Sequence, residues 1–367
     1  MANLFVVFTP LQLVMAQQII RQEELANNLL MESWWDGYSH FKDIYDMTVI
    51  DDLWSKEIYF ENWACWDYEG INLLKNTIKI KKRAKEIKKI LEDNHVNTIY
   101  LADFQNQTNR FTCVWLAKQG YKVVFFEEGY SHYIPRPSLA PPQTFIHRVY
   151  EKMLDVFYYQ PLYHVHFAEW RCYPNKDYHG LPISTRYSVI PDMHHEPYDK
   201  LLKCEPMVSP KLQTYINEEL DNSDAKKILL LTDPMTEVLQ PQYRYLYFET
   251  ISEALDKYKD ESVVVKFHPR EFENDREATL KLIKDKGLNC SVLGKRINIP
   301  VELYLQNCQF DEILFFNTST YFYNGFLFPK AKFVKLLPLL HKKCIENNIP
   351  CLEQMETLIK YIETYQK

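Results

Sequence analysis

Glycine is scarce in this chain, with 8 glycines among 367 residues. Neither G-x-G-x-x-G nor a P-loop occurs, which excludes a phosphate site built from a glycine-rich loop. A nucleotide would therefore have to be held by side chains and helix N-termini. The net charge is -6 with both signs interspersed, so the composition gives no general attraction to nucleic acid.

The eight cysteines lack C-x-x-C pairing, and their spacing fits neither a zinc site nor a disulfide framework. We expect most of them to be reduced, buried thiols. The N-terminus lacks the basic segment of a signal peptide, and no apolar run is long enough to cross a membrane. These features predict a cytoplasmic protein, and the length predicts two domains.

Apolar, β-branched segments alternate with helical patterns along the chain, which predicts parallel sheets. Thr9 and Pro10 provide the cap and first turn of a helix directly after the first strand. We expect strands at 4–8, 47–50, 98–101, 123–126, 227–231, 263–267, 312–316 and 332–336, and helices at 12–21, 76–91, 245–258, 276–286 and 352–365. The expected organisation is an N-terminal domain at 1–190, a linker at 191–225, a C-terminal domain at 226–345 and a final helix at 346–367.

The end of the strand at 263–267 carries residues suited to ligand binding. Its three valines predict a strand buried on both faces. Lys266 and His268 share one side of the chain by the period of two, and Pro269 ends the ladder. Ligands bind at the carboxyl ends of strands in open α/β sheets, so this position predicts a site.

A second strand end is acidic, because the strand at 123–126 leads into Glu127, Glu128 and Gly129. Two adjacent carboxylates are electrostatically unfavourable there, and the glycine permits a tight turn. This segment also predicts a functional site. A solvated acidic loop is the alternative.

Together, these motifs resemble those of bacterial sialyltransferases, most closely glycosyltransferase family 52 and its relatives. Members share an acidic-acidic-glycine motif after an N-domain strand and a His-Pro motif after a C-domain strand, here 127–129 and 268–269. The segments Thr9-Pro10-Leu11-Gln12, Leu230-Leu231-Thr232-Asp233-Pro234 and Thr318-Ser319-Thr320 strengthen the resemblance. Many relatives carry an aspartate in the acidic pair, which leaves open whether Glu127 or Glu128 reaches the acceptor.

The resemblance implies an α/β protein of GT-B fold, two Rossmann-like domains with a central cleft. It implies inverting transfer from CMP-sialic acid to a glycan hydroxyl, without metal or cofactor, and a terminal galactose of lipooligosaccharide or capsule as acceptor. Glu127 would take the acceptor proton and His268 would assist the leaving phosphate. Donor contacts are implied for Lys266, Pro269, Glu302, Thr318, Ser319 and Thr320, and acceptor-side contacts for Thr9, Gln12, Glu128 and Gly129.

Most of these residues also have an ordinary structural explanation. Thr9 and Thr318 could only cap helices, and Glu302 could be a first-turn glutamate favoured by the helix dipole. Lys266 could be a solvated charge and His268 a histidine satisfied at a turn. The pairs His164/His166 and His194/His195 lack partners at metal spacing, so we expect packed or surface histidines there.

Two other functions compete with sialyl transfer. Transfer of Kdo or another CMP-activated nonulosonate would use the same chemistry. A nucleotide-sugar 2-epimerase also places histidine and proline at a C-domain strand end, but normally with a Ser-Gly-Gly segment that 316–320 lacks. For partners, we expect no nucleic acid and a homodimer. The lysines and the arginine of the helix at 76–91 form a solvated face or contact anionic lipid at the inner membrane surface.

Overall fold

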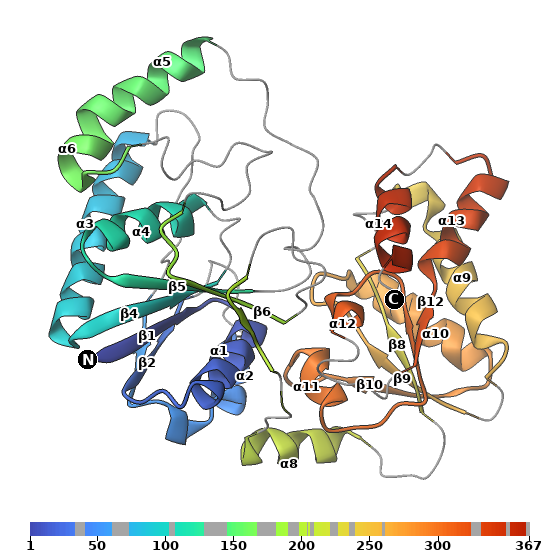
Figure 1. Cartoon of the computed structure of the whole chain (residues 1–367). Helices are drawn as coiled ribbons and strands as arrows, with labels where there is room; N and C mark the ends of the chain where they lie inside the picture. The colour runs from blue at the N-terminus through green and yellow to red at the C-terminus, as the bar shows by residue number, and fades with distance from the viewer. Residues whose placement is uncertain are drawn as a thin grey trace. The chain divides into compact units, whose positions relative to one another are not determined.

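The chain folds into two compact units, Met1–Met207 and Val208–Lys367, each built around one parallel sheet (Figure 1). The computed structural model describes residues 1–33, 41–60, 73–102, 107–127, 145–166, 181–189, 198–203, 205, 209–220, 227–234, 239–258, 261–323, 332–349 and 353–364.

The first unit contains a seven-stranded sheet of order β3-β2-β1-β4-β5-β6-β7, in which every pair is parallel. The order reverses between β1 and β4, which is the topological switch point of a Rossmann-like sheet. Its elements are β1 (Ala2–Val7), α1 (Pro10–Gln22), β2 (Asn28–Glu32), α2 (Phe41–Thr48), β3 (Lys56–Tyr59), α3 (Leu73–Asp93), β4 (Val96–Leu101), α4 (Gln107–Lys118), β5 (Lys122–Phe126), α5 (Phe145–Leu154), α6 (Gln160–Tyr163), β6 (Thr185–Ser188) and β7 (Lys200–Leu201).

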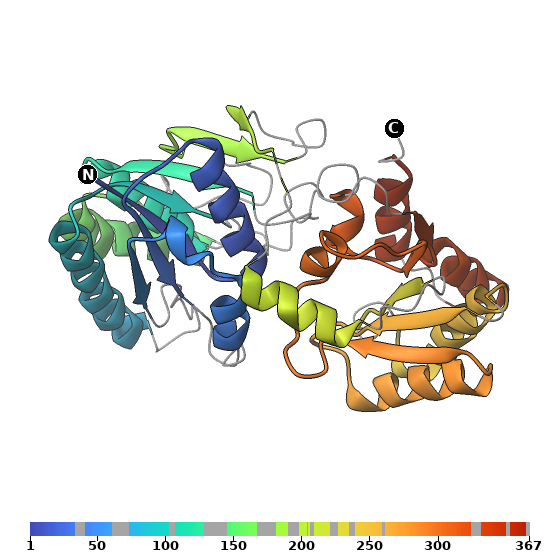
Figure 2. The ribbon, with the colours of Figure 1, turned by 90° about the horizontal axis from the view of Figure 1, so that it is seen from below.

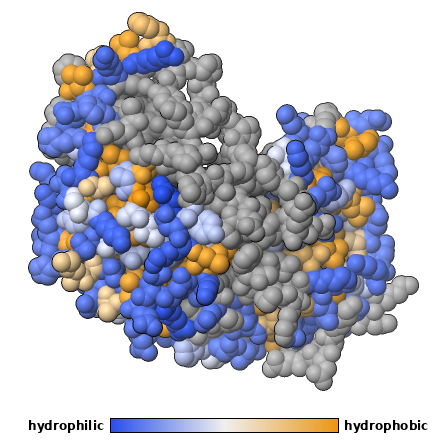
Figure 3. Space-filling view, viewed as in Figure 1, coloured by the Kyte–Doolittle hydropathy of each residue, from blue (hydrophilic) through white to orange (hydrophobic). Residues whose placement is uncertain are grey.

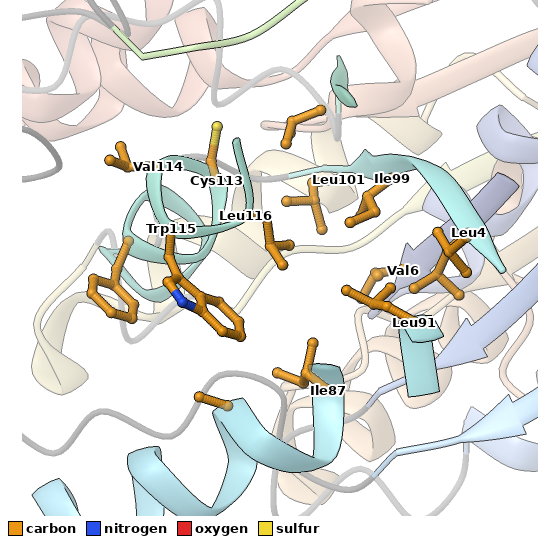
Figure 4. Close-up of a cluster of buried hydrophobic side chains, with 14 of the residues drawn as sticks. Leu4, Val6, Ile87, Leu91, Ile99, Leu101, Cys113, Val114, Trp115 and Leu116 are labelled. Carbon is orange, nitrogen blue, oxygen red and sulfur yellow. The ribbon is translucent and has the colours of Figure 1, made fainter. Parts of the chain in front are cut away.

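The core of the first unit follows the alternation of side chains along its strands. Leu4 and Val6 of β1 pack in one cluster with Ile87 of α3 and Leu116 of α4 (Figure 4). Phe5 lies between them in sequence and instead stacks on Tyr100, with ring centroids 4.0 Å apart. The sheet is therefore buried on both faces, as the apolar strands in the sequence predict.

The second unit contains a five-stranded parallel sheet of order β10-β9-β8-β11-β12, with its switch point between β8 and β11. Helix α9 packs against both α10 and α13, and α10 lies along β10 (Figure 2). The elements are α8 (Pro210–Glu219), β8 (Lys227–Leu231), α9 (Tyr245–Leu255), β9 (Ser262–Lys266), α10 (Glu273–Asp285), β10 (Asn289–Leu293), α11 (Val301–Leu305), β11 (Glu312–Phe315), α12 (Ser319–Phe322), β12 (Phe333–Lys335), α13 (Leu337–Glu346) and α14 (Glu353–Thr364).

One expected strand is wrong, because residues 47–48 complete helix α2 and 49–50 follow it. Ile44 and Tyr45 are buried one turn earlier, and the Thr48 hydroxyl donates to the Ile44 carbonyl at 2.7 Å. The Val49 amide donates to the Tyr45 carbonyl at 2.8 Å. Packing of an apolar helix face thus overrides the strand preference of a short β-branched run.

The described cysteines are free thiols of different burial. Cys113 and Cys344 are buried free thiols, whereas Cys308 is half-buried and Cys290 is exposed. No helix within the described ranges is long and apolar enough to cross a membrane.

Candidate active site

Three strands of the second unit end at the edge where its order reverses. Thr232 and Asp233 follow β8, His268 follows β9, and Asn317 follows β11. The Asp233 carboxylate accepts from the Asn317 amide at 2.7 Å, which joins the ends of β8 and β11 across the switch point. This edge is where open α/β sheets bind their ligands.

His268 lies in a turn that fixes its imidazole. Its Nδ1 accepts from the Arg270 amide at 3.2 Å, so the neutral ring carries its proton on Nε2. Burial, with the neighbouring charges of Arg270, Lys266 and Arg276, lowers the pKa of His268 to about 4. The imidazole is therefore neutral near pH 7 and offers one N–H donor.

Lys266 is almost fully buried, and its ammonium donates to the Asn298 side chain. Burial lowers the pKa of Lys266 to about 8, although the carboxylates of Glu219 and Glu302 favour its charged form. Gly294 approaches the same ammonium with φ +73°, and a Cβ there would lie 3.1 Å from Nζ. The positive φ favours glycine here, and a Cβ would force the lysine tip or the neighbouring Asn298 backbone to shift by a few tenths of an ångström.

Glu302 lies at the start of α11 and accepts hydrogen bonds from α12. The Thr320 hydroxyl donates to Oε1 at 2.8 Å, whereas that of Ser319 lies 3.5 Å away. The Thr318 hydroxyl donates to the Thr320 oxygen at 2.9 Å, and its oxygen caps the Thr320 amide at 3.3 Å. Burial raises the pKa of Glu302. Thr318 and Thr320 therefore serve this internal network, and Ser319 has the most loosely held hydroxyl of the three.

In the first unit, Thr9 follows β1 and caps α1, and Gln12 lies in the first turn of that helix. The Thr9 hydroxyl oxygen caps the Gln12 amide at 3.3 Å, as the sequence predicts. Gln12 is fully buried, and its Oε1 accepts from the Phe8 amide at 2.6 Å. Its Nε2 has no hydrogen-bond partner within the part of the chain that the structure describes. Both residues thus lie beside the switch point between β1 and β4.

Glu127 follows β5 and is fully buried. Its Oε2 accepts from the Ser188 hydroxyl at 3.0 Å and from the Val189 amide at 2.7 Å. These bonds tie the end of β5 to the end of β6 and fix the direction of the carboxylate. The other two residues of the acidic motif, Glu128 and Gly129, lie outside the described residues.

Among the described residues, the structure shows no group of histidine, cysteine and carboxylate side chains that could hold a metal ion at the histidine pairs. His166 Nδ1 lies 3.6 Å from Asp155, and its side chain is exposed. The His164 carbonyl accepts from the Lys118 ammonium at 2.8 Å. His194 and His195 lie outside the described residues.

Two further carboxyls of the second unit, half-buried Glu219 and buried Glu271, take part in hydrogen bonds beside the carboxyl edge of its sheet. Glu219 ends α8, within the expected linker, and accepts from the Tyr215 hydroxyl at 2.7 Å and the Gly294 amide at 2.9 Å. The spacing of four residues is a signal for the Tyr215 contact, but nothing in the sequence signals the contact with Gly294. Glu271 comes three residues after His268, the spacing at which a four-residue turn closes, and this spacing is a usable signal.

The family model described as Alpha-2,8-polysialyltransferase (POLYST) matches residues 3–336. The chain belongs to this family. The resemblance to bacterial sialyltransferases is thereby confirmed, and the protein is a glycosyltransferase. No curated protein sequence matches the chain.

Solved structures of low sequence identity share the fold. The α/β-galactoside α-2,3-sialyltransferase of Photobacterium phosphoreum matches with a TM-score of 0.51 and 11% identity, over 95% of this chain and 96% of that one. The UDP-GlcNAc 2-epimerase of Neisseria meningitidis matches with a TM-score of 0.51 and 13% identity, over 100% and 93%. These likenesses bear on the fold alone, which is GT-B as expected.

Proposed function

We propose that this polysialyltransferase-family protein moves sialic acid from CMP-sialic acid to a glycan hydroxyl, with inversion and without metal. Direct displacement needs a base for the acceptor hydroxyl and donors for the charge that develops on the leaving CMP phosphate. The neutral imidazole of His268, held at the switch-point edge with its Nε2–H available, is the observation that carries the proposal.

The donor side of the proposal uses groups of the second unit. His268 donates to the leaving phosphate from Nε2, and Ser319 donates from its loosely held hydroxyl. Lys266 supplies a nearby cation. Burial lowers the pKa of Lys266 only to about 8, so the lysine is mostly charged near pH 7, and an anion beside it would favour that charge further and be stabilised in return.

The acceptor side uses Glu127 as the general base, with Glu128 as the second candidate. Ser188 and Val189 hold Oε2 of Glu127, which fixes the direction of the carboxylate before any acceptor arrives. We expect Glu127→Gln to lower the transfer rate by about 10²–10⁴-fold while CMP binding is retained. Ser188→Ala is the matched control, because it removes one hydrogen bond but keeps the carboxylate. Retained turnover in Glu127→Gln, with loss in Glu128→Gln, would assign the base to Glu128.

The acceptor is proposed to be the sialic acid at the end of a growing chain. This choice rests on the family description, which names α-2,8-polysialyl transfer, and it replaces the terminal galactose expected from the sequence. Two acceptors separate the possibilities: an α-2,8-linked sialic acid oligomer and a galactoside. Extension of the oligomer alone supports the proposal, whereas transfer to the galactoside alone contradicts it.

A calorimetric titration tests the donor. We expect purified protein to bind CMP in preference to UDP, and His268→Ala to weaken CMP binding by about tenfold, the effect of losing one charge-assisted hydrogen bond. Preference for UDP would instead favour the nucleotide-sugar epimerase. The same assay with EDTA present should leave transfer unchanged.

We also propose a cytoplasmic enzyme in peripheral contact with an anionic membrane. The apolar side chains Phe145, Val149 and Met153 recur every four residues on α5 and are exposed, and Figure 3 shows apolar atoms at this helix. The basic residues Arg148 and Lys152 are exposed on the same helix. Co-flotation with anionic vesicles should fall when Phe145 and Met153 are both changed to serine, and unchanged flotation would contradict the contact.

A further inference from the structure

The turn that carries His268 is closed by its own backbone. The Glu271 amide donates to the His268 carbonyl at 3.0 Å, and Pro269 occupies the second position, which its fixed φ favours. Arg276 donates to the His268 and Pro269 carbonyls at 3.3 and 3.4 Å. These bonds shape the turn but do not attach it to the neighbouring strand.

Two side chains make that attachment. The His268 amide donates to the Thr232 hydroxyl oxygen at 3.2 Å, and the Thr232 hydroxyl donates to the Glu271 carboxylate. The His268 amide can only donate, so the Thr232 oxygen accepts from it, and the single proton of the Thr232 hydroxyl goes to Glu271. Thr232 directly follows β8, whereas both other residues lie in the turn after β9. The relay therefore holds the turn against the end of β8, next to the switch point.

We propose that Glu271, acting through Thr232, is a positioning residue that holds His268 in the orientation that receives the leaving phosphate. This inference rests on the proposed function. The carboxyl needs no substrate contact, because its effect passes through the Thr232 hydroxyl to the His268 backbone. Both Glu271 and Thr232 are almost fully buried, so their hydrogen bonds are shielded from competing water.

The charges around Glu271 also determine how it would respond to an anion bound beside His268. Asp275 disfavours its ionised form and Arg276 favours it, and Asp275 is itself paired with Arg244 at 3.3 Å. Burial dominates and raises the pKa of Glu271 to about 7. Phosphate beside His268 would disfavour a second negative charge, so CMP binding should weaken as Glu271 ionises above neutral pH. Lys266 titrates near 8 and produces a separate loss at higher pH.

The test compares wild type with Thr232→Val, Thr232→Ser and Glu271→Gln, and Thr250→Val serves as control. Thr250 is a buried threonine of the same unit whose hydroxyl donates within its own helix at 2.7 Å. Calorimetry with CMP should give about tenfold weaker binding for Thr232→Val and near wild-type binding for Thr232→Ser and the control. Glu271→Gln should abolish the loss of CMP affinity that begins near pH 7, and it should retain the loss at higher pH that Lys266 produces.

Nitrogen NMR of the His268 ring reports its tautomer and its pKa without any ligand. Wild type and Thr232→Ser should show the Nε2–H tautomer and a titration near pH 4, and Thr232→Val should move that titration upward by about one pH unit or more. Wild type that fails to bind CMP would overturn the proposed function, and the NMR comparison would still decide the inference. If Thr232→Val folds and its His268 titration is unchanged, the positioning role is overturned. If Thr232→Val does not fold, a Glu271→Gln variant whose CMP binding has the same pH profile as wild type would overturn it.

Discussion

Glu271 should make the second unit less stable as pH rises, and Glu271→Gln should remove this dependence. Burial raises the pKa of this carboxyl from 4.5 to about 7 in the folded chain. The folded state therefore prefers the protonated form, and its stabilisation is full below the unfolded pKa and lost as pH rises through the folded one. At about 1.4 kcal/mol per pKa unit, the complete loss over the shift from 4.5 to about 7 is about 3.5 kcal/mol.

About 2.5 kcal/mol of this loss develops between pH 5 and pH 8, because unfolded Glu271 is already mostly ionised at the lower value. The glutamine still accepts from the Thr232 hydroxyl, and any cost of burying its amide is the same at both pH values. The free energy of unfolding of Glu271→Gln relative to wild type should therefore rise by about 2.5 kcal/mol between pH 5 and pH 8.

The assay has to report the second unit. All seven tryptophans lie before residue 171, so their fluorescence follows the first unit only. Hydrogen exchange measured across a urea titration, in peptides that cover β8 and β9, reports the unit that contains Glu271. A stability difference between variant and wild type that stays constant within about 0.5 kcal/mol from pH 5 to pH 8 would refute the reasoning.

Two further substitutions test the rest of the donor edge. Gly294→Ala should destabilise the second unit by about 1–2 kcal/mol in urea unfolding and weaken CMP binding, because the residue has φ +73° and its Cβ would meet Lys266; full retention of both would contradict the packing. Thr320→Val should cost about 1–3 kcal/mol in the same unfolding assay, because it removes the 2.8 Å hydrogen bond to buried Glu302, and Thr320→Ser should restore most of it.

The sequence predicted the strand ends better than the side-chain networks around them. The strands that carry Glu127 and His268 are confirmed, because continuous β-branched and apolar runs in an α/β pattern identify buried parallel strands. The strand predicted at 47–50 was wrong, because tertiary packing determines the secondary structure of such a short, ambiguous apolar run. The contact of Glu219 with Gly294 could not be predicted, because these residues are 75 positions apart and meet only in the folded unit. Its contact with Tyr215 is local, four residues apart in α8.

Among the described residues at the carboxyl edge of the second unit's sheet, several hydroxyl protons are already used in buried hydrogen bonds. The Thr232 hydroxyl proton is committed to Glu271, and that of Thr320 to Glu302. Each hydroxyl has only one proton, so neither can also donate to a phosphate without breaking a buried bond. His268 Nε2–H and the Ser319 hydroxyl, 3.5 Å from its acceptor, are donors that a ligand can engage at little cost. The two threonines are therefore better assigned to holding the histidine turn and the start of α12 than to binding the leaving group themselves.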